Sequence, residues 1–196
     1  MTKPQRFINL RGTSGAGKTT LARAILNGYE HTEDFFREGR KQPIYSVLQR
    51  MGYVGRPLMV LGHYRAACGG CDTITELDDV FRLVRVGLEA NHDVLFEGLI
   101  LSGEIARTLE LGLDLHSNGK MLHVLALDTP VDRCVSNINL RREARGQMEP
   151  VRPKNTIAKA RCVELTMKKL TGQPGLACGV ASYGDTQAQV EYLLHG

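Results

Sequence analysis

One eight-residue segment constrains the fold of this chain more than any other. Residues 12–19 have the sequence Gly-Thr-Ser-Gly-Ala-Gly-Lys-Thr and match the pattern G-x-x-x-x-G-K-[ST] in full. The apolar run 7–10 precedes the segment and predicts a buried strand, and residues 19–26 follow it with helical periodicity. A strand, a glycine-rich turn and a helix in this order predict a phosphate-binding loop in an α/β fold.

Each residue type in this loop has a physical role in holding a polyphosphate. Glycines let the backbone wrap closely, so that successive N–H groups point at one anionic centre, and the helix start adds its positive dipole end. Lys18 supplies a mobile ammonium for the β- and γ-phosphates, and the Thr19 hydroxyl is a ligand for Mg²⁺. We therefore predict ATP, with GTP as the alternative, and Mg²⁺ as cofactors. The predicted nucleotide-binding residues are Gly12, Thr13, Ser14, Gly15, Ala16, Gly17, Lys18, Thr19 and Thr20.

Phosphoryl transfer also needs a carboxylate near the metal, at the carboxyl end of a neighbouring strand. Glu97 ends the apolar run 94–96 and precedes a glycine that allows close approach. Asp128 ends another apolar run but stands directly before Thr129 and Pro130, where a role at a helix start explains it more simply. We predict that Lys18 and Glu97 are catalytic, and that Glu97 joins Thr19 in holding Mg²⁺, directly or through a water molecule.

The remaining sequence alternates strands with helices. Further strands are predicted at 44–51, 58–61, 121–127 and 176–181, and helices at 76–90, 102–111, 129–145, 156–170 and from 185 onward. The predicted N-caps of four of these helices are Thr75, Ser102, Thr129 and Asp185. Residues 27–42 are polar, with charges of both signs, and indicate helix ends and a loop. The pattern predicts one α/β domain over 1–196, with a mainly parallel sheet covered by helices on both faces.

Positive charge is concentrated in one part of the chain. Residues 133–169 contain ten Lys and Arg against three acidic residues, a net charge of +7, whereas the whole chain carries +4. Arg141 and Arg145 are four residues apart and share a predicted helix face, and Gly146 follows where a mobile connection is expected. We predict a lid over about 137–155, in which Arg141 and Arg145 stabilise charge on the transferred phosphoryl group. A solvated, ion-paired helix face is the alternative.

Two further features bound the cellular setting. No apolar stretch approaches the length of a membrane span, and residues 1–6 lack signal-peptide character, so we expect a cytoplasmic protein with no membrane partner. Among five cysteines, Cys68 and Cys71 form the one close pair. A structural zinc site usually takes two such pairs, so a glycine-permitted turn is favoured over zinc binding.

Taken together, these residues resemble a known group of enzymes. The loop 12–20, the pair Glu97-Gly98, and Asp128-Thr129-Pro130 followed by Arg141-Arg142 are similar to the small P-loop kinases related to nucleoside and nucleotide kinases, over essentially the whole chain. The resemblance implies a five-stranded parallel sheet in the order 2-3-1-4-5. It also implies a lid after the fourth strand, an adenine-contacting loop at 182–185, and a phosphotransferase with an alcohol group as acceptor. The chain departs from thymidylate kinases, because no Asp-Arg pair follows the Glu97 strand.

A narrower resemblance rests on residues 7–15 and on Gly62-His63-Tyr64 leading into residues 68–73. These segments look like bacteriophage P-loop kinases that phosphorylate 5-hydroxymethyluracil within DNA, a step in thymidine hypermodification. The resemblance implies DNA with a modified pyrimidine as acceptor and, for a phage protein, a location in the host cytoplasm.

The segment 53–72 is expected beside the phosphate site, at the carboxyl end of a strand. Its candidate substrate residues are Arg56, His63, Tyr64, Arg65 and Asp72. Tyr64 could stack on a base, and Arg56 or Arg65 could contact a DNA phosphate. A kinase of a free nucleoside, nucleotide or other small metabolite is the alternative function. A regulatory P-loop NTPase is a third, which the absence of a switch-like sequence disfavours.

Overall fold

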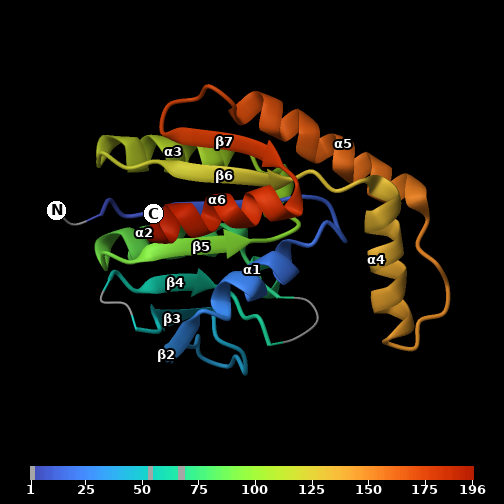
Figure 1. Ribbon diagram of the computed structural model, residues 1–196, viewed down its shortest axis with the longest axis horizontal. Coiled ribbons are helices and arrows are strands. Elements are labelled where there is room, and N and C mark those ends of the chain that lie inside the picture. The colour runs from blue at the N-terminus through green and yellow to red at the C-terminus, as the bar shows by residue number, and fades with distance from the viewer. Residues whose placement is uncertain (1–2, 53–54, 66–68) are drawn as a thin grey trace.

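The computed structural model describes residues 3–52, 55–65 and 69–196. The middle of the predicted turn at 52–55 and Cys68 lie outside these residues. A seven-stranded mixed sheet, in the order β2-β3-β4-β5-β1-β6-β7, forms the centre (Figure 1). The strands are β1 (Phe7–Arg11), β2 (Tyr29–Phe35), β3 (Tyr45–Arg50), β4 (Leu58–Leu61), β5 (Asp93–Glu97), β6 (Leu122–Leu127) and β7 (Leu176–Ala181). The helices are α1 (Lys18–Leu26), α2 (Leu77–Glu89), α3 (Ala106–Ser117), α4 (Val131–Glu143), α5 (Pro153–Leu170) and α6 (Tyr183–His195).

Five strands of this sheet are parallel. β4, β5, β1, β6 and β7 pair in parallel, and numbered among themselves they have the predicted order 2-3-1-4-5. The prediction of a five-stranded parallel sheet was nevertheless wrong, because β2 and β3 extend the β4 edge in antiparallel pairing. The prediction of helix ends and a loop over 27–42 was wrong for residues 29–35, which form β2. β2 is an edge strand whose side chains are mostly exposed, so its sequence carries little apolar periodicity.

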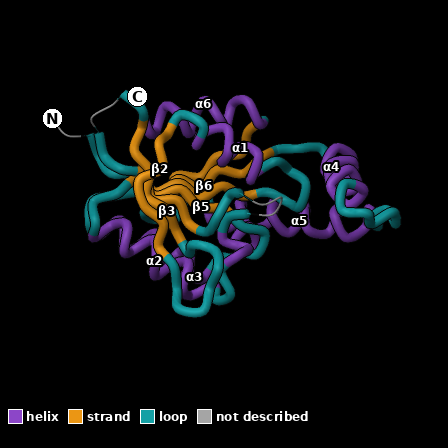
Figure 2. Tube along the Cα trace, turned by 90° about the horizontal axis from the view of Figure 1, so that it is seen from below, coloured by secondary structure: helices purple, strands orange, loops and turns teal. Residues whose placement is uncertain are grey.

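Alternating side chains on the parallel strands build two separate cores. Phe7, on one face of β1, packs in a cluster with side chains of α2, α3 and α5. Ile8, on the other face, packs with side chains of α1 and α6. Figure 2 shows the same layering, with α1 and α6 on one side of the sheet and α2 and α3 on the other. Both faces of the parallel strands are therefore covered, as the alternation of strands and helices predicts.

The four predicted N-caps were wrong, and the hydroxyl groups of Ser102 and Thr129 make loop or turn contacts instead. Ser102 lies in a short 3₁₀ turn, Leu101–Gly103, and α3 begins only at Ala106. The Thr129 hydroxyl donates to the Ala16 carbonyl (2.9 Å), and Pro130 precedes the first residue of α4. Glu76 rather than Thr75 precedes α2, and Ser182 rather than Asp185 caps α6.

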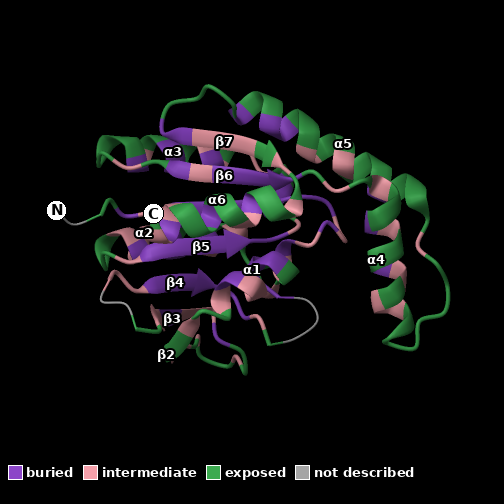
Figure 3. Ribbon diagram, viewed as in Figure 1, coloured by how far each residue is buried: buried purple, intermediate pink, exposed green. Residues whose placement is uncertain are grey.

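Helix α4 projects beyond the carboxyl ends of the parallel strands. It packs against α5, which returns across the 3₁₀ turn to β7 (Figure 1). Most of the surface of α4 is exposed, in contrast to the buried central strands (Figure 3). Among the helices of the described residues, none combines the length and apolar character needed to cross a membrane.

Candidate active site

A cavity of about 1140 Å³ lies at the carboxyl edge of the parallel strands. Its wall is formed by the loop after β1, the ends of β5 and β6, one side of α4 and the start of α6. Pockets for a single small ligand usually measure about 300–1,000 Å³. The cavity is therefore slightly larger than the usual range for one small ligand.

The glycine-rich loop lines the cavity with residues 14–20. Lys18 is buried, and its Nζ donates to the carbonyl oxygens of Gly12 (2.8 Å) and Thr13 (3.2 Å). Burial lowers the pKa of Lys18, and the nearby carboxyl of Glu97 opposes that effect. Gly15 has φ +77°, and a Cβ there would lie 2.3 Å from the carbonyl oxygen of Cys134, so the close approach of α4 requires glycine. The Thr13 hydroxyl is buried without a hydrogen-bond partner, which fits a loop shaped for an anionic ligand.

Glu97 ends β5 directly across from this loop. Its carboxyl is 1% exposed, and Oε1 accepts a hydrogen bond of 2.8 Å from the Thr19 hydroxyl. Burial raises the pKa of Glu97 to about 7, although Lys18 and the Thr19 hydrogen bond act in the opposite direction. A carboxyl with a pKa near neutrality suits a group that takes up a proton during catalysis.

The pair Thr19 and Glu97 also fits a divalent metal. Mg²⁺ prefers oxygen ligands and is usually held by one or two carboxylates together with substrate phosphates and water. A hydroxyl and a carboxylate in contact beside the phosphate loop supply that donor set. Within the described residues, no group of three or more His, Cys, Asp or Glu side chains could hold a metal without a substrate.

Hydrogen bonds tie the phosphate loop to the strand that carries Glu97. The Gly12 N–H donates to Ser102 Oγ (3.2 Å), and the same hydroxyl donates to the Gly98 carbonyl (2.8 Å). Arg11, fully buried just before the loop, donates to the Glu104 carbonyl (2.9 Å) and the Thr108 hydroxyl (2.6 Å). Burial lowers the pKa of Arg11 to about 10. These hydrogen bonds were not predicted from the sequence. The position of Arg11 directly after a predicted buried strand could have indicated them.

One face of α4 is turned toward the cavity. Arg133, Asn137 and Arg141 are four residues apart and all line it, and Asn137 Nδ2 donates to the Gly15 carbonyl (2.9 Å). Arg133 was missed by sequence reasoning, although its spacing from Arg141 could have revealed it.

The prediction that Arg145 shares this face was wrong. The helix ends at Glu143, because Gly146 adopts φ +75° and its N–H bonds back to the Glu143 carbonyl. Among the described residues, Arg145 lies outside the cavity lining.

Four of the candidate substrate residues follow β4 at the cavity edge. Asp72 lines the cavity, and its carboxyl accepts from the Leu99 N–H (2.7 Å). His63 lies beside Gly69, which also lines it, and the Arg65 N–H donates to His63 Nδ1 (3.3 Å). Tyr64 packs against the core, and its buried hydroxyl has no hydrogen-bond partner, so it offers a polar atom rather than an open ring face. Arg23 was missed by sequence reasoning: it lines the cavity and donates from Nε to the Tyr64 carbonyl (2.8 Å).

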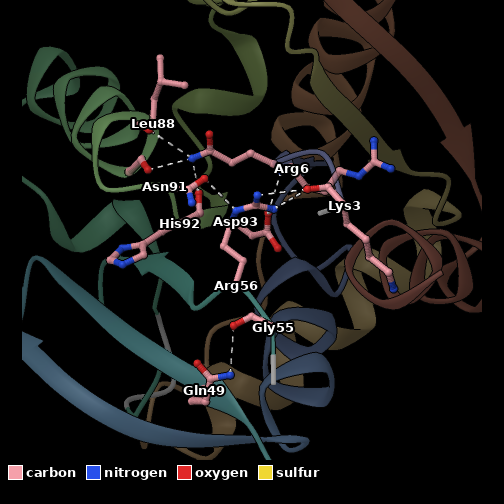
Figure 4. Close-up of polar contacts among 11 residues, drawn as sticks. Lys3, Arg6, Gln49, Gly55, Arg56, Leu88, Asn91, His92 and Asp93 are labelled. Carbon is pink, nitrogen blue, oxygen red and sulfur yellow. Dashed lines mark hydrogen bonds and ion pairs between the residues drawn. The ribbon is translucent and has the colours of Figure 1, made fainter. Parts of the chain in front are cut away.

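The remaining candidate, Arg56, lies at the opposite edge of the sheet. Arg56 precedes β4, whereas His63 follows it, so the length of the strand separates the two. Figure 4 shows the Arg56 guanidinium between Asn91 and Lys3, with hydrogen bonds of 3.0 and 3.1 Å, and an ion pair of 3.6 Å to Asp93. The expectation that Arg56 lies beside the phosphate site was therefore wrong.

The other end of the cavity is formed by the segment after β7. Ser182, Tyr183 and Gly184 line it, and the Tyr183 ring lies next to Gly17 of the phosphate loop. Asp128 lines the cavity as well, from the end of β6. Asp128 and Glu97 both line the cavity, but Glu97 is the one that makes a direct hydrogen bond with Thr19.

The fold and this site define a P-loop kinase, a nucleotide-binding phosphotransferase. Over 167 residues the chain is 45% identical to "5-hmdU DNA kinase" of Pseudomonas phage PaMx11, and the match covers 85% of each protein. The chain belongs to the family of this phage kinase. No protein-family model matches it. Among solved structures, deoxyadenosine kinase from M. mycoides with bound dATP aligns over 94% of this chain and 96% of its own, with 13% identity and a TM-score of 0.41.

Proposed function

We propose that this enzyme transfers the γ-phosphate of ATP to the hydroxymethyl group of 5-hydroxymethyluracil in DNA, a step of thymidine hypermodification. The acceptor follows from the family, whose phage member is named a 5-hmdU DNA kinase. The contact between Glu97 and Thr19, at the junction of the phosphate loop and the β5 end, carries the mechanism. An enzyme acting on phage DNA works where that DNA is copied, in the host cytoplasm.

In this proposal the residues of the loop hold the donor. Residues 12–20 wrap the triphosphate, Lys18 turns from the loop carbonyls to the β- and γ-phosphates, and the segment 182–185 borders the base. Thr19 and Glu97 hold Mg²⁺, which neutralises charge on the phosphates when bound. GTP is the alternative donor.

Glu97 acts on the acceptor. As the hydroxymethyl oxygen attacks the γ-phosphorus, its proton passes to the Glu97 carboxylate, and the bond from the γ-phosphorus to the bridging oxygen breaks. The products are ADP and a phosphomonoester on the base. Because the hydroxymethyl group must reach the γ-phosphate in line, a base in a duplex is flipped out or presented single-stranded.

The single domain 1–196 includes a lid over about 137–155. Arg141 and Arg133 face the cavity from α4, where closure over the triphosphate would bring positive charge to the transferred phosphoryl group. Arg145, beyond the helix end, serves the mobile connection rather than the cavity face.

The test is transfer from γ-labelled ATP with Mg²⁺ to a panel of acceptors. The panel holds DNA containing 5-hydroxymethyluracil, the same DNA with thymine, and free nucleosides and nucleotides. We expect label on the modified DNA alone, and no label with Lys18→Ala. Label on a free nucleoside or nucleotide but never on modified DNA would instead identify a small-molecule kinase. ATP hydrolysis without any labelled acceptor would identify a regulatory NTPase.

A further inference from the structure

Beside the cavity, a buried imidazole has a hydrogen-bond donor without an acceptor. His63 is 7% exposed, and its backbone carbonyl accepts from the Gly70 N–H (3.0 Å), which fixes it behind the cavity wall. Its Nδ1 accepts from the Arg65 N–H (3.3 Å), so the proton of the neutral ring is on Nε2. Nε2 is buried and has no partner. A buried N–H without an acceptor is rare, and a water molecule or an ion is a usual source of the missing acceptor.

The positive charges of three arginines from different segments act on this imidazole. Arg23 comes from α1, Arg40 from the loop after β2, and Arg65 from the segment after β4. Burial lowers the pKa of His63, and the positive charges of these three arginines lower it further. Asp34 opposes them, but its carboxyl is already shared with Arg65 at 3.3 Å. The missing acceptor is therefore expected on an anion.

Each of the three arginines makes a hydrogen bond or an ion pair that holds it in place. Arg23 donates from Nε to the Tyr64 carbonyl (2.8 Å) and lines the cavity itself. Arg40 donates to the Thr73 carbonyl, in the turn that includes Asp72. Arg65 remains 75% exposed at its side chain. Planar guanidinium groups anchored at one side suit phosphate oxygens, to which arginine can donate two parallel hydrogen bonds.

We propose that His63, Arg23, Arg40 and Arg65 form a phosphate-binding subsite that holds a backbone phosphodiester of the DNA strand carrying the acceptor base. This inference rests on the proposed function, because it places a DNA phosphate next to Glu97. The His63 Nε2–H donates to one phosphate oxygen, and the guanidinium groups neutralise the charge. A 5′-phosphate of a free nucleotide has the same chemistry and is the other source that the experiment separates.

The experiment compares Arg40→Gln and Arg65→Gln with Arg82→Gln, an exposed arginine on α2 that is paired with Asp79 outside the subsite. Binding to an oligonucleotide with 5-hydroxymethyluracil is measured without ATP between about 50 and 200 mM KCl, where each lost phosphate contact lowers the salt slope by about 0.7–0.9. We expect that decrease for Arg40→Gln and Arg65→Gln, together with a KM for DNA raised about tenfold and a KM for ATP unchanged. Arg82→Gln should match the wild type.

A second pair of variants tests the imidazole. His63→Gln keeps an N–H donor and should retain most of the DNA affinity, whereas His63→Leu should lose it about tenfold while still binding ATP. Unchanged affinity and salt slope in the arginine variants, with DNA still phosphorylated, would overturn the subsite alone. If the variants weaken the binding of 5-hydroxymethyl-dUMP but leave DNA binding unchanged, the subsite holds a free nucleotide, and the DNA assignment is overturned. A wild-type enzyme that never labels modified DNA would overturn the proposed function itself.

Discussion

The hydroxyl of Thr19, the last residue of the phosphate-loop pattern, donates a 2.8 Å hydrogen bond to the buried carboxyl of Glu97, 78 residues further along the chain. This contact joins the end of the phosphate loop to the end of β5. It places a group that can take up a proton beside a group that can bind metal. The predictions below follow from this junction and from the surfaces around it.

Replacing Glu97 by glutamine should separate catalysis from binding. The amide keeps the shape and can still accept the Thr19 hydrogen bond, but it cannot take the acceptor proton. We expect kcat to fall by roughly 10²–10⁴ while the affinity for ATP changes little. Steady-state kinetics and ATP titration measure the two quantities. Glu110→Gln, on the exposed side of α3, is the control, and an unchanged kcat in Glu97→Gln would move the role to Asp128 or Asp72.

The same variant should change how stability depends on pH. Burial raises the folded-state pKa of Glu97 to about 7 from 4.5, so between these values the folded protein binds more protons than the unfolded chain. Stability of the wild type therefore declines as the pH rises from 4.5 to 7, and Glu97→Gln removes that decline. In thermal unfolding with a chelator and without nucleotide, the Tm of the variant relative to that of the wild type should increase as the pH rises to about 7–8. A difference in Tm that stays constant over this range contradicts the buried, proton-binding carboxyl.

Gly70 packs against the same carboxyl and should not accept a side chain. A Cβ at Gly70 would lie 2.5 Å from Glu97 Oε1, whereas nothing lies within 4 Å of one at Gly119. Both glycines have a positive φ, +69° and +66°, but Gly70 also has ψ −154°, a region essentially restricted to glycine, so alanine at Gly70 carries more backbone strain than the roughly 1 kcal/mol expected at Gly119. Gly119→Ala should lower Tm by about 2–4 °C and spare kcat. Gly70→Ala should lower Tm further and should lower kcat at least tenfold. Equal values of kcat in the two variants would mean that the position of Glu97 does not depend on this contact.

The cavity-facing side of α4 should matter more than the residues beyond its end. Arg133→Ala and Arg141→Ala each remove a charge that lines the cavity, and a charge-assisted hydrogen bond of about 1.5–3 kcal/mol corresponds to roughly 10- to 100-fold in kcat/KM for ATP. Arg145→Ala should have a smaller effect, because α4 ends at Glu143. Kinetics at saturating DNA measure all three. If Arg145→Ala lowers kcat/KM as much as Arg141→Ala does, the proposed position of Arg145 is wrong, and the segment after α4 must close over the triphosphate as well.

The parts of the fold that sequence could predict are those that leave an apolar or glycine pattern. The strand before Gly12, the loop and the strand ending at Glu97 all carry such patterns, whereas the 2-3-1-4-5 order of the parallel strands followed from the resemblance to small P-loop kinases. β2 does not, because an exposed edge strand needs no apolar alternation. Its antiparallel hairpin with β3 therefore could not be seen in the polar residues 27–42.

The site was predictable where chemistry is local and missed where it depends on three-dimensional contacts. Glu97 followed from its position at a strand end. Arg23 and Arg133 were missed because the cavity that they line is formed by segments far apart in the chain, which only the folded structure brings together. Arg56 was misplaced because residues just before and just after a four-residue strand are close in sequence but lie at opposite edges of the sheet.

The central claim is tested most directly by the mass of the product base. DNA with one 5-hydroxymethyluracil and blocked ends is incubated with the enzyme, ATP and Mg²⁺, then digested to nucleosides and weighed by mass spectrometry. We predict that the modified nucleoside gains the mass of one phosphoryl group, that thymidine gains none, and that Glu97→Gln abolishes the gain. An unmodified 5-hydroxymethyl nucleoside after complete incubation, with phosphate found on a sugar or on a free nucleotide instead, would contradict the account.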